Sequence, residues 1–217
     1  MKKEQYIDEN TVLERAEEWI SAVKPYIRAH WEPVAAQTAI IIVDAQRYFF
    51  NEDFHGFIPA SSAILPNLIK LAQRGAKIGA KVIATRHAEI ETDFVFTMHQ
   101  FWDDTIYDGT LEAELISPLK RLGLPIVRKS TYDAFWNTDL EEMLREWGIE
   151  WIAIAGVMTD LCCETTARSA FVRGFMPIFI ADATATVTEE LHLSTLRTLA
   201  HGFAKITTTE MFLKSLK

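Results

Sequence analysis

The feature that most constrains the fold is the stretch from Trp151 to Phe171. Its first half is a short apolar run that ends at Gly156 and is typical of a buried strand, and its second half has apolar residues at helical spacing. The stretch therefore predicts a strand, a tight loop and a helix in immediate succession. Two cysteines, Cys162 and Cys163, fall where the loop becomes the helix. A thiol there is near unpaired backbone N–H groups and the positive end of the helix dipole, which favours the thiolate.

Apolar runs and amphipathic patterns alternate along the rest of the chain. Continuous runs of the kind found in a sheet buried on both faces occur at 38–44, 81–85, 125–128, 151–155, 176–181 and 204–206. Between these runs, apolar residues at helical spacing predict helices at 64–78, 138–147, 162–173 and 188–201. We expect the helix at 138–147 to begin with a capping box, Thr138 to Glu141. The alternation predicts an α/β fold of three α/β/α layers, with a doubly wound, mostly parallel sheet of about six strands.

Residues 1–37 precede the first predicted strand and form an N-terminal helical extension to the α/β domain at 38–217. Helical spacing runs from Thr11 to Val23, and Pro25 and Pro33 break the pattern that follows. The segment predicts a packing or oligomer arm.

Composition limits the classes of function. A chain of 217 residues, 49% of them hydrophobic, can bury a full core. The formal net charge of −8, without runs of Lys or Arg, argues against nucleic acid as the partner. No glycine-rich phosphate loop points to a nucleotide, and no apolar stretch approaches the roughly 20 residues that cross a bilayer. The sequence therefore predicts a cytoplasmic protein that acts on a small molecule and does not bind a membrane. The two cysteines are adjacent and cannot easily bridge each other, so we expect free thiols.

Three polar residues stand where predicted strands end or the following helix begins. Asp44 ends the first strand, Lys129 ends the third, and Cys162 opens the helix after the fourth. In open parallel sheets ligands bind beyond the carboxyl ends of the strands, so these side chains are candidates for a site. Each also has an ordinary explanation, as a helix cap, a surface charge and a small core residue respectively.

Three sequence blocks carry a resemblance to a known family. They are Asp44-Ala-Gln46 after an apolar strand, a Lys-x-x-Tyr-x-Ala-Phe block from Lys129 to Phe135, and Gly156-Val-Met-Thr-Asp-Leu-Cys162. In this order and spacing they resemble the isochorismatase-like cysteine hydrolases, which include nicotinamidases, N-carbamoylsarcosine amidases and isochorismatases. The resemblance covers about residues 38–206.

The resemblance implies a catalytic triad of Asp44, Lys129 and Cys162. It also implies a cis peptide before Met158, which would aim the amides of Met158 and Cys162 at one oxyanion. Asp44 would accept the thiol proton, Lys129 would hold that carboxylate ionised, and the thiolate would attack a planar carbonyl carbon. Hydrolysis of the resulting thioester completes the cleavage of a C–N bond in a small amide or carbamoyl compound, and no cofactor is required.

Two alternatives stay open at this point. The isochorismatases cleave a vinyl ether without a covalent intermediate and resemble this chain, but they carry glycine at the position of Cys162. A non-catalytic binding module on the same fold is the other alternative. We also expect a homo-oligomer, a dimer or a tetramer.

Loop residues that follow the strands are candidates for substrate binding, although core packing explains any one of them equally well. They are Gln46, Phe49, Trp102, Tyr132, Phe135 and Trp136. Nicotinamidases of the family carry an Asp-x-His metal pair after the second strand, where this chain has His87-Ala-Glu89. We therefore expect no metal.

Overall fold

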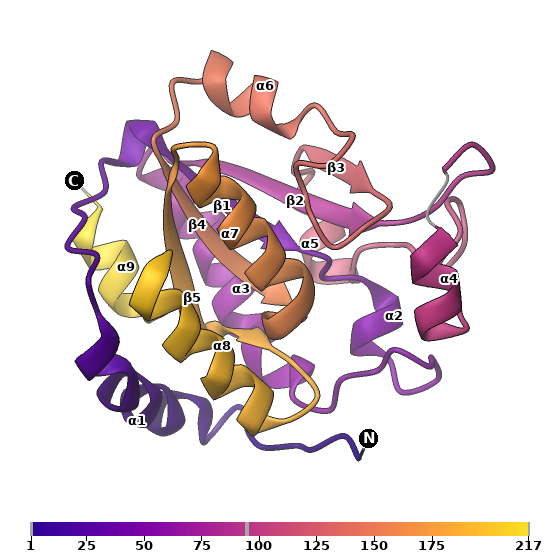
Figure 1. The fold of residues 1–217 in the computed structure, drawn as a ribbon, viewed down its shortest axis with the longest axis horizontal. Coiled ribbons are helices and arrows are strands. Elements are labelled where there is room, and N and C mark those ends of the chain that lie inside the picture. The colour runs from indigo at the N-terminus through magenta and orange to yellow at the C-terminus, as the bar shows by residue number, and fades with distance from the viewer. Residues whose placement is uncertain (1, 94–95, 217) are drawn as a thin grey trace.

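The computed structural model describes residues 2–93 and 96–216, and they form one parallel sheet with helices on both faces (Figure 1). The strands are β1 (Thr38–Val43), β2 (Lys81–His87), β3 (Ile126–Lys129), β4 (Trp151–Val157), β5 (Met176–Ala185) and β6 (Lys205–Thr207). Their order across the sheet is β3-β2-β1-β4-β5-β6, and every neighbouring pair is parallel. The predicted α/β class and six-stranded sheet are confirmed.

The helices cover the sheet because each presents one apolar stripe to it. In Figure 1, α7 (Glu164–Val172) and α8 (Glu189–Gly202) lie in front of the sheet and α3 (Ser61–Lys77) lies behind it. The other α-helices are α1 (Val12–Val23), α2 (Arg47–Phe50), α4 (Phe96–Trp102), α5 (Ser117–Lys120), α6 (Leu140–Glu146) and α9 (Thr209–Ser215). The part of the chain that the structure describes also contains two 3₁₀ turns, η1 (Lys24–Tyr26) and η2 (Ala35–Gln37), and a π-helical turn, η3 (Thr159–Cys163).

The strand order reverses direction between β1 and β4, which are neighbours in the centre of the sheet. β1 is buried along its whole length, as its β-branched composition predicts. At such a reversal the connections leave toward opposite faces and open a crevice at the carboxyl ends of the strands. The residues that follow β1 and β4 therefore lie where a ligand site is expected.

Two local predictions need correction. The capping box is wrong: Asp139 is the N-cap of α6 and makes no side-chain cap. The Thr138 hydroxyl donates instead to the carbonyl of Ala134 at 2.6 Å and accepts from the amide of Leu140, not of Glu141, at 3.4 Å. Strand β5 also continues past Ala181 to Ala185, with a register shift against β4 between Ile154 and Gly156.

The N-terminal extension packs on the sheet of its own chain. Helix α1 contacts β5, β6 and α8, and its Trp19 is almost fully buried. Ile7, Val12, Ala16 and Val23 join the same hydrophobic core as the strands. None of the described helices combines the length and apolarity needed to cross a bilayer.

Candidate active site

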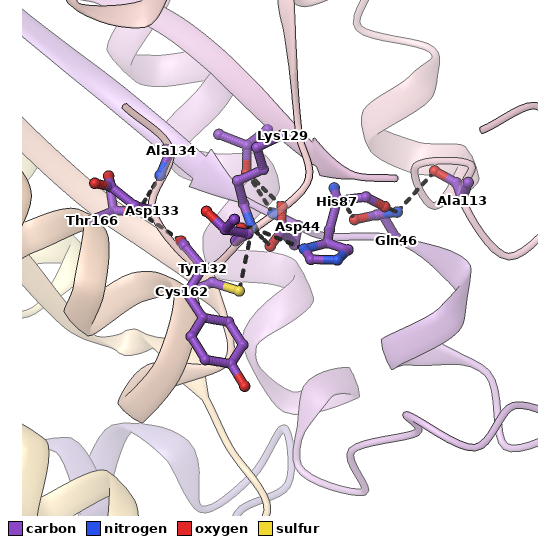
Figure 2. A network of polar contacts seen from close by, with 12 residues as sticks. Asp44, Gln46, His87, Ala113, Lys129, Tyr132, Asp133, Ala134, Cys162 and Thr166 are labelled. Carbon is purple, nitrogen blue, oxygen red and sulfur yellow. Dashed lines mark hydrogen bonds and ion pairs between the residues drawn. The ribbon is translucent and has the colours of Figure 1, made fainter. Parts of the chain in front are cut away.

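Asp44, Lys129 and Cys162 meet at the carboxyl edge of the sheet, as predicted from their positions after strands (Figure 2). Lys129 Nζ lies 2.7 Å from Asp44 Oδ2 and donates to Cys162 Sγ at 3.3 Å. Asp44 directly follows β1, Lys129 is the last residue of β3, and Cys162 lies in η3 after β4. Strands β1, β3 and β4, whose site residues are far apart in the sequence, thus bring an acid, an ammonium and a thiol together.

The two charges of this cluster are completely buried but well partnered. Asp44 is 0% exposed and Lys129 is 1% exposed. Thr85 Oγ1 on β2 donates to Asp44 Oδ1 at 2.7 Å and accepts from the Asp44 amide at 3.1 Å, while Lys129 Nζ also donates to the Thr131 carbonyl at 2.8 Å. Isolated buried charges are very costly, so an ion pair held at this edge of the sheet indicates a function for the pair. Thr85 had not been singled out from the sequence.

His87 is the fourth group of the cluster. Its Nδ1 lies 3.4 Å from Lys129 Nζ. Burial, together with the Lys129 ammonium, lowers the pKa of His87 to about 4, so the ring is neutral at neutral pH. Donor atoms of Asp44, His87 and Cys162 all lie within 4.8 Å of one another, which is close enough to hold a cation. The Lys129 ammonium contacts all three of these residues and is the cation that they surround.

The resting thiol of Cys162 is protonated, which corrects the expectation of a thiolate at a helix N-terminus. Burial raises its pKa to about 12, and the Lys129 ammonium offsets this only in part. Cys162 lies inside η3, before the first residue of α7, and is 5% exposed. Burial acts to lower the pKa of Lys129, but the Asp44 carboxylate acts in the opposite direction and the pKa is raised overall. The site therefore holds a neutral thiol beside an ammonium–carboxylate pair.

The backbone before the thiol has the arrangement implied by the resemblance. The peptide between Val157 and Met158 is cis. Met158 and Cys162 both line one cavity of about 270 Å³, whereas Cys163 is fully buried and is not part of the lining. Burial also raises the pKa of Cys163 well above its ordinary value. Of the two adjacent thiols, Cys162 is the one that faces the cavity.

Aromatic side chains form much of the cavity wall. Three of the predicted substrate-binding residues line it: Phe49, Trp102 and Tyr132. Trp102 Nε1 donates to the Tyr132 hydroxyl at 2.5 Å, which joins α4 to the loop after β3. Tyr48 adds a fourth ring to the lining. These flat, apolar surfaces suit a small planar molecule.

The other three predicted substrate-binding residues lie elsewhere. Gln46 is fully buried, and its amide donates to the carbonyls of His87 and Ala113 and accepts from the His87 amide (Figure 2). It therefore ties the end of β1 to β2 and has no free donor for a substrate. Phe135 packs against Phe175 in the core, and Trp136 is 42% exposed outside the cavity lining.

The lining also contains polar groups that were not among the predicted substrate-binding residues: Lys3, Tyr48, His55, Asp104 and Thr105. Tyr48 OH donates to Asp104 Oδ2 at 2.6 Å, and His55 Nδ1 lies 3.2 Å from the same oxygen. The aromatic run after Asp44-Ala-Gln46 was a signal for Tyr48. Lys3 gave no signal, because it reaches the cavity only through the path of the N-terminal extension.

Comparison with known proteins identifies the family. The family model of the isochorismatase domain matches residues 38–211. Nicotinamidase 3 of Arabidopsis thaliana is 35% identical over 200 residues, which cover 90% of this chain and 97% of that protein. A cysteine hydrolase from Pseudomonas syringae pv. phaseolicola superposes with a TM-score of 0.82 at 26% identity, covering 88% of this chain and 96% of the other.

A pyrazinamidase of Pyrococcus horikoshii, solved in complex with zinc, has a TM-score of 0.70 at 26% identity and covers 79% of this chain and 99% of its own. The sequence match, the parallel sheet and the acid, ammonium and thiol at its carboxyl edge agree with one another. The chain belongs to the isochorismatase domain family.

Proposed function

We propose that this isochorismatase-family hydrolase cleaves the C–N bond of a small amide or carbamoyl compound through a thioester on Cys162. The observation that carries the proposal is the contact of Lys129 Nζ with both Asp44 Oδ2 and Cys162 Sγ, beside an aromatic-lined cavity. Relatives named nicotinamidase and pyrazinamidase support an amide as the substrate class.

The first step forms a tetrahedral intermediate that is covalently bound to Cys162. Asp44 accepts the proton of the Cys162 thiol, and the sulfur attacks the carbonyl carbon, so that the C–S bond forms as the carbonyl electrons move to oxygen. Lys129 pairs with Asp44 Oδ2 at 2.7 Å and stays beside the sulfur as negative charge develops on it. The amides of Met158 and Cys162 are the proposed oxyanion donors, each worth a factor of about 10²–10³ in rate in other enzymes.

The second step releases the products. The oxyanion re-forms the carbonyl, the C–N bond breaks, and Asp44 returns its proton to the leaving nitrogen. Asp44, again a carboxylate, takes a proton from a water molecule that attacks the thioester carbonyl. Collapse of that intermediate breaks the C–S bond and returns the proton to sulfur, so the net reaction is amide plus water to carboxylic acid plus amine.

One similar protein was solved in complex with zinc, but the residues of this chain at the corresponding place differ in chemistry. The residues at the end of β2 and just after it do not suit a metal ion: His87 faces the Lys129 ammonium, and Glu89 Oε2 lies 2.8 Å from His99 Nε2. A metal ion near His87 would share the space with a fixed positive charge. The proposed mechanism therefore uses Asp44, Lys129 and Cys162 and has no step through a metal.

A vinyl ether hydrolase needs no nucleophilic sulfur at this place. Here the thiol lines the cavity and contacts Lys129, which favours the covalent route over the ether alternative. A binding module would not need to bury an ammonium–carboxylate pair against that thiol.

Mass spectrometry tests the proposal directly. The protein is incubated with nicotinamide, pyrazinamide and a panel of small primary amides and carbamoyl compounds, quenched in acid and mapped by peptide. We expect an acyl adduct on the peptide that contains Cys162, together with release of ammonia or amine. Cys163→Ala is the matched control and should form the same adduct. Amide hydrolysis that persists in Cys162→Ala would contradict the proposal.

We also propose a cytoplasmic homo-oligomer, a dimer or a tetramer. Support comes from exposed apolar side chains, such as Phe101 at 77% and Val172 at 73% exposure. Light scattering of the purified protein measures the mass, and a monomer at micromolar concentration would contradict the oligomer.

A further inference from the structure

Residues 3–6, the N-terminal strap, join two loops at the edge of the cavity. On one side, Lys3 Nζ donates to two backbone carbonyls of the 55–57 loop, at 2.6 Å and 2.7 Å. On the other side, the amide of Glu4 donates to the carbonyl of Val187, in the loop before α8, at 2.8 Å. Lys3 and Val187 both line the cavity. The strap is therefore part of the wall that surrounds a substrate.

Lys3 is a cation of this wall whose acceptors, among the described residues, include no acidic side chain. The carboxylate of Asp104 accepts from Tyr48 OH at 2.6 Å, and Glu89 Oε2 lies 2.8 Å from His99 Nε2, so both acids are engaged. Among the described residues, neutral carbonyls are the acceptors of the Lys3 ammonium. Partial burial lowers the pKa of Lys3.

We propose that Lys3 is a specificity-determining residue that selects substrates carrying a carboxylate at the end remote from the scissile carbonyl. An ammonium has three N–H donors, and the 55–57 loop takes two, so the third is available to a substrate oxygen. A carboxylate supplies both the acceptor and a countercharge. Cys162 lines the same cavity, so one small molecule can place its carbonyl at the thiol and its carboxylate at Lys3. This inference rests on the proposed hydrolysis at Cys162.

Binding to a Cys162→Ala protein tests the inference without chemistry. Calorimetry compares two matched pairs of ligands that differ in length: succinamate with succinamide, and 4-carbamoylbenzoate with terephthalamide. Each pair keeps the reacting amide and exchanges the remote carboxylate for a neutral carboxamide. Because the Lys3 ammonium is partly exposed, we expect at least one acid to bind about tenfold more tightly than its neutral partner.

Variants of Lys3 separate its charge from the closure of the strap. Lys3→Gln should remove the preference for the acid, whereas Lys3→Arg should keep most of it. Lys2→Gln is the matched control, since Lys2 lies outside the cavity lining, and it should leave the preference unchanged. A loosened strap would weaken the acid and the amide alike and would not alter their ratio.

The inference is overturned if neither acid binds more tightly than its neutral partner, or if neither acid binds measurably. It is also overturned if the preference for the acid persists in Lys3→Gln. Failure here is distinct from failure of the proposed function. Acyl transfer to Cys162 without a carboxylate preference removes only the role of Lys3, and a Lys3-dependent preference without an adduct removes only the hydrolysis.

Discussion

At the scale of single residues, the site places a proton donor and its acceptor side by side without ionising the donor in advance. The Cys162 thiol has a pKa of about 12 because it is buried, while the nearby Asp44 carboxylate is held by Lys129 and Thr85. The thiolate therefore needs to form only when the sulfur attacks the carbonyl carbon of a bound substrate. A buried thiol that stays protonated between turnovers also resists oxidation, since the thiolate is the reactive form.

We expect the three residues to act as a unit. Asp44→Asn, Lys129→Met and Cys162→Ala should each lower turnover by on the order of 10³ or more, and combinations should lower it little further. Lys129→Met should also destabilise the fold by about 3 kcal/mol, because it leaves the Asp44 carboxylate buried without its partner. Turnover and urea unfolding measure the two effects.

The double variant Asp44→Asn/Lys129→Met is the control for that cost. It removes both charges and should unfold at a higher urea concentration than Lys129→Met alone, while remaining inactive. Near-normal turnover in Lys129→Met would show that the ammonium has no catalytic part.

The adjacent cysteines should differ in reactivity. Cys162 lines the cavity, whereas Cys163 is fully buried, so iodoacetamide should modify Cys162 and leave Cys163 intact. Below a pKa of about 12 the thiolate fraction grows about tenfold per pH unit, so the rate should rise accordingly between pH 7 and pH 9. Peptide mapping and inactivation kinetics measure both. A rate that is flat with pH would show a thiolate already formed at pH 7.

At the scale of elements, the site depends on how closely the ends of β1 and β4 approach. Val43 at the end of β1 is paired with Gly156 near the end of β4. Gly156 has φ of 116°, and a Cβ built on it would lie 2.0 Å from the Val43 carbonyl oxygen. Only glycine fits this position, which sets the distance between the residue that carries the acid and the loop that carries the thiol.

Gly156→Ala should therefore damage both stability and catalysis. The methyl group must displace the backbone of Val43, next to Asp44, and we expect a loss of about 2 kcal/mol or more in the free energy of unfolding. Turnover per folded molecule should fall as well, because Asp44 moves with Val43. Gly202→Ala is the matched control: it lies at the end of α8, nothing lies within 4 Å of its added Cβ, and it should change neither quantity much. Equal effects of the two substitutions would contradict the role of Gly156.

Elements with a strong local signal were predictable, and those defined by tertiary contacts were not. The long apolar run of β1 and the strand–loop–helix stretch from β4 were clear in the sequence, and three separate blocks pointed to Asp44, Lys129 and Cys162. Helices α4 and α9 have 7 residues each and were not predicted, whereas α6, of the same length, was predicted because Gly148 marks its end and apolar residues repeat along it. Gln46 was assigned to the substrate because sequence gives no view of the carbonyls that occupy its amide.

At the scale of the whole molecule, the N-terminal extension is connected to the nucleophile. The ring of Trp19 on α1 lies 4.3 Å from the ring of His192 on α8, and His192 Nδ1 lies 3.0 Å from Thr159 Oγ1 at the start of η3. Cys162 is in the same turn. Sequence analysis predicted α1 itself but not this contact, since the partners are far apart in the chain. The strap and α1 together make the extension part of the cavity wall and of its support.

Two buried histidines, His192 and His87, make the fold sensitive to acid. Burial lowers the pKa of His192 to about 3 and that of His87 to about 4, against an ordinary value of 6.5 in the unfolded chain. Between about pH 6.5 and pH 4, these two histidines are therefore protonated in the unfolded state and neutral in the folded state. Stability from these groups is present above pH 6.5 and is lost as the pH falls below it. Asp160 and Asp182 act in the opposite direction, because burial raises the pKa of each in the folded state.

A substitution of His192 isolates its share of this acid sensitivity. When the pH falls from 7 to 5, protonation of His192 in the unfolded state should lower the free energy of unfolding by about 2 kcal/mol. Each pH unit below 6.5 contributes about 1.4 kcal/mol to this loss. His192→Gln lacks the titrating group, so its stability should fall by about 2 kcal/mol less than that of the unmodified protein over the same interval, whatever the substitution costs at pH 7. The comparison cancels the contributions of the two aspartates and of every other group that both proteins share. Urea unfolding at pH 7 and pH 5 gives the four free energies. Equal losses in the two proteins would mean that His192 accepts a proton in the folded state, and the packing of Trp19 over its ring would then not be what keeps it neutral.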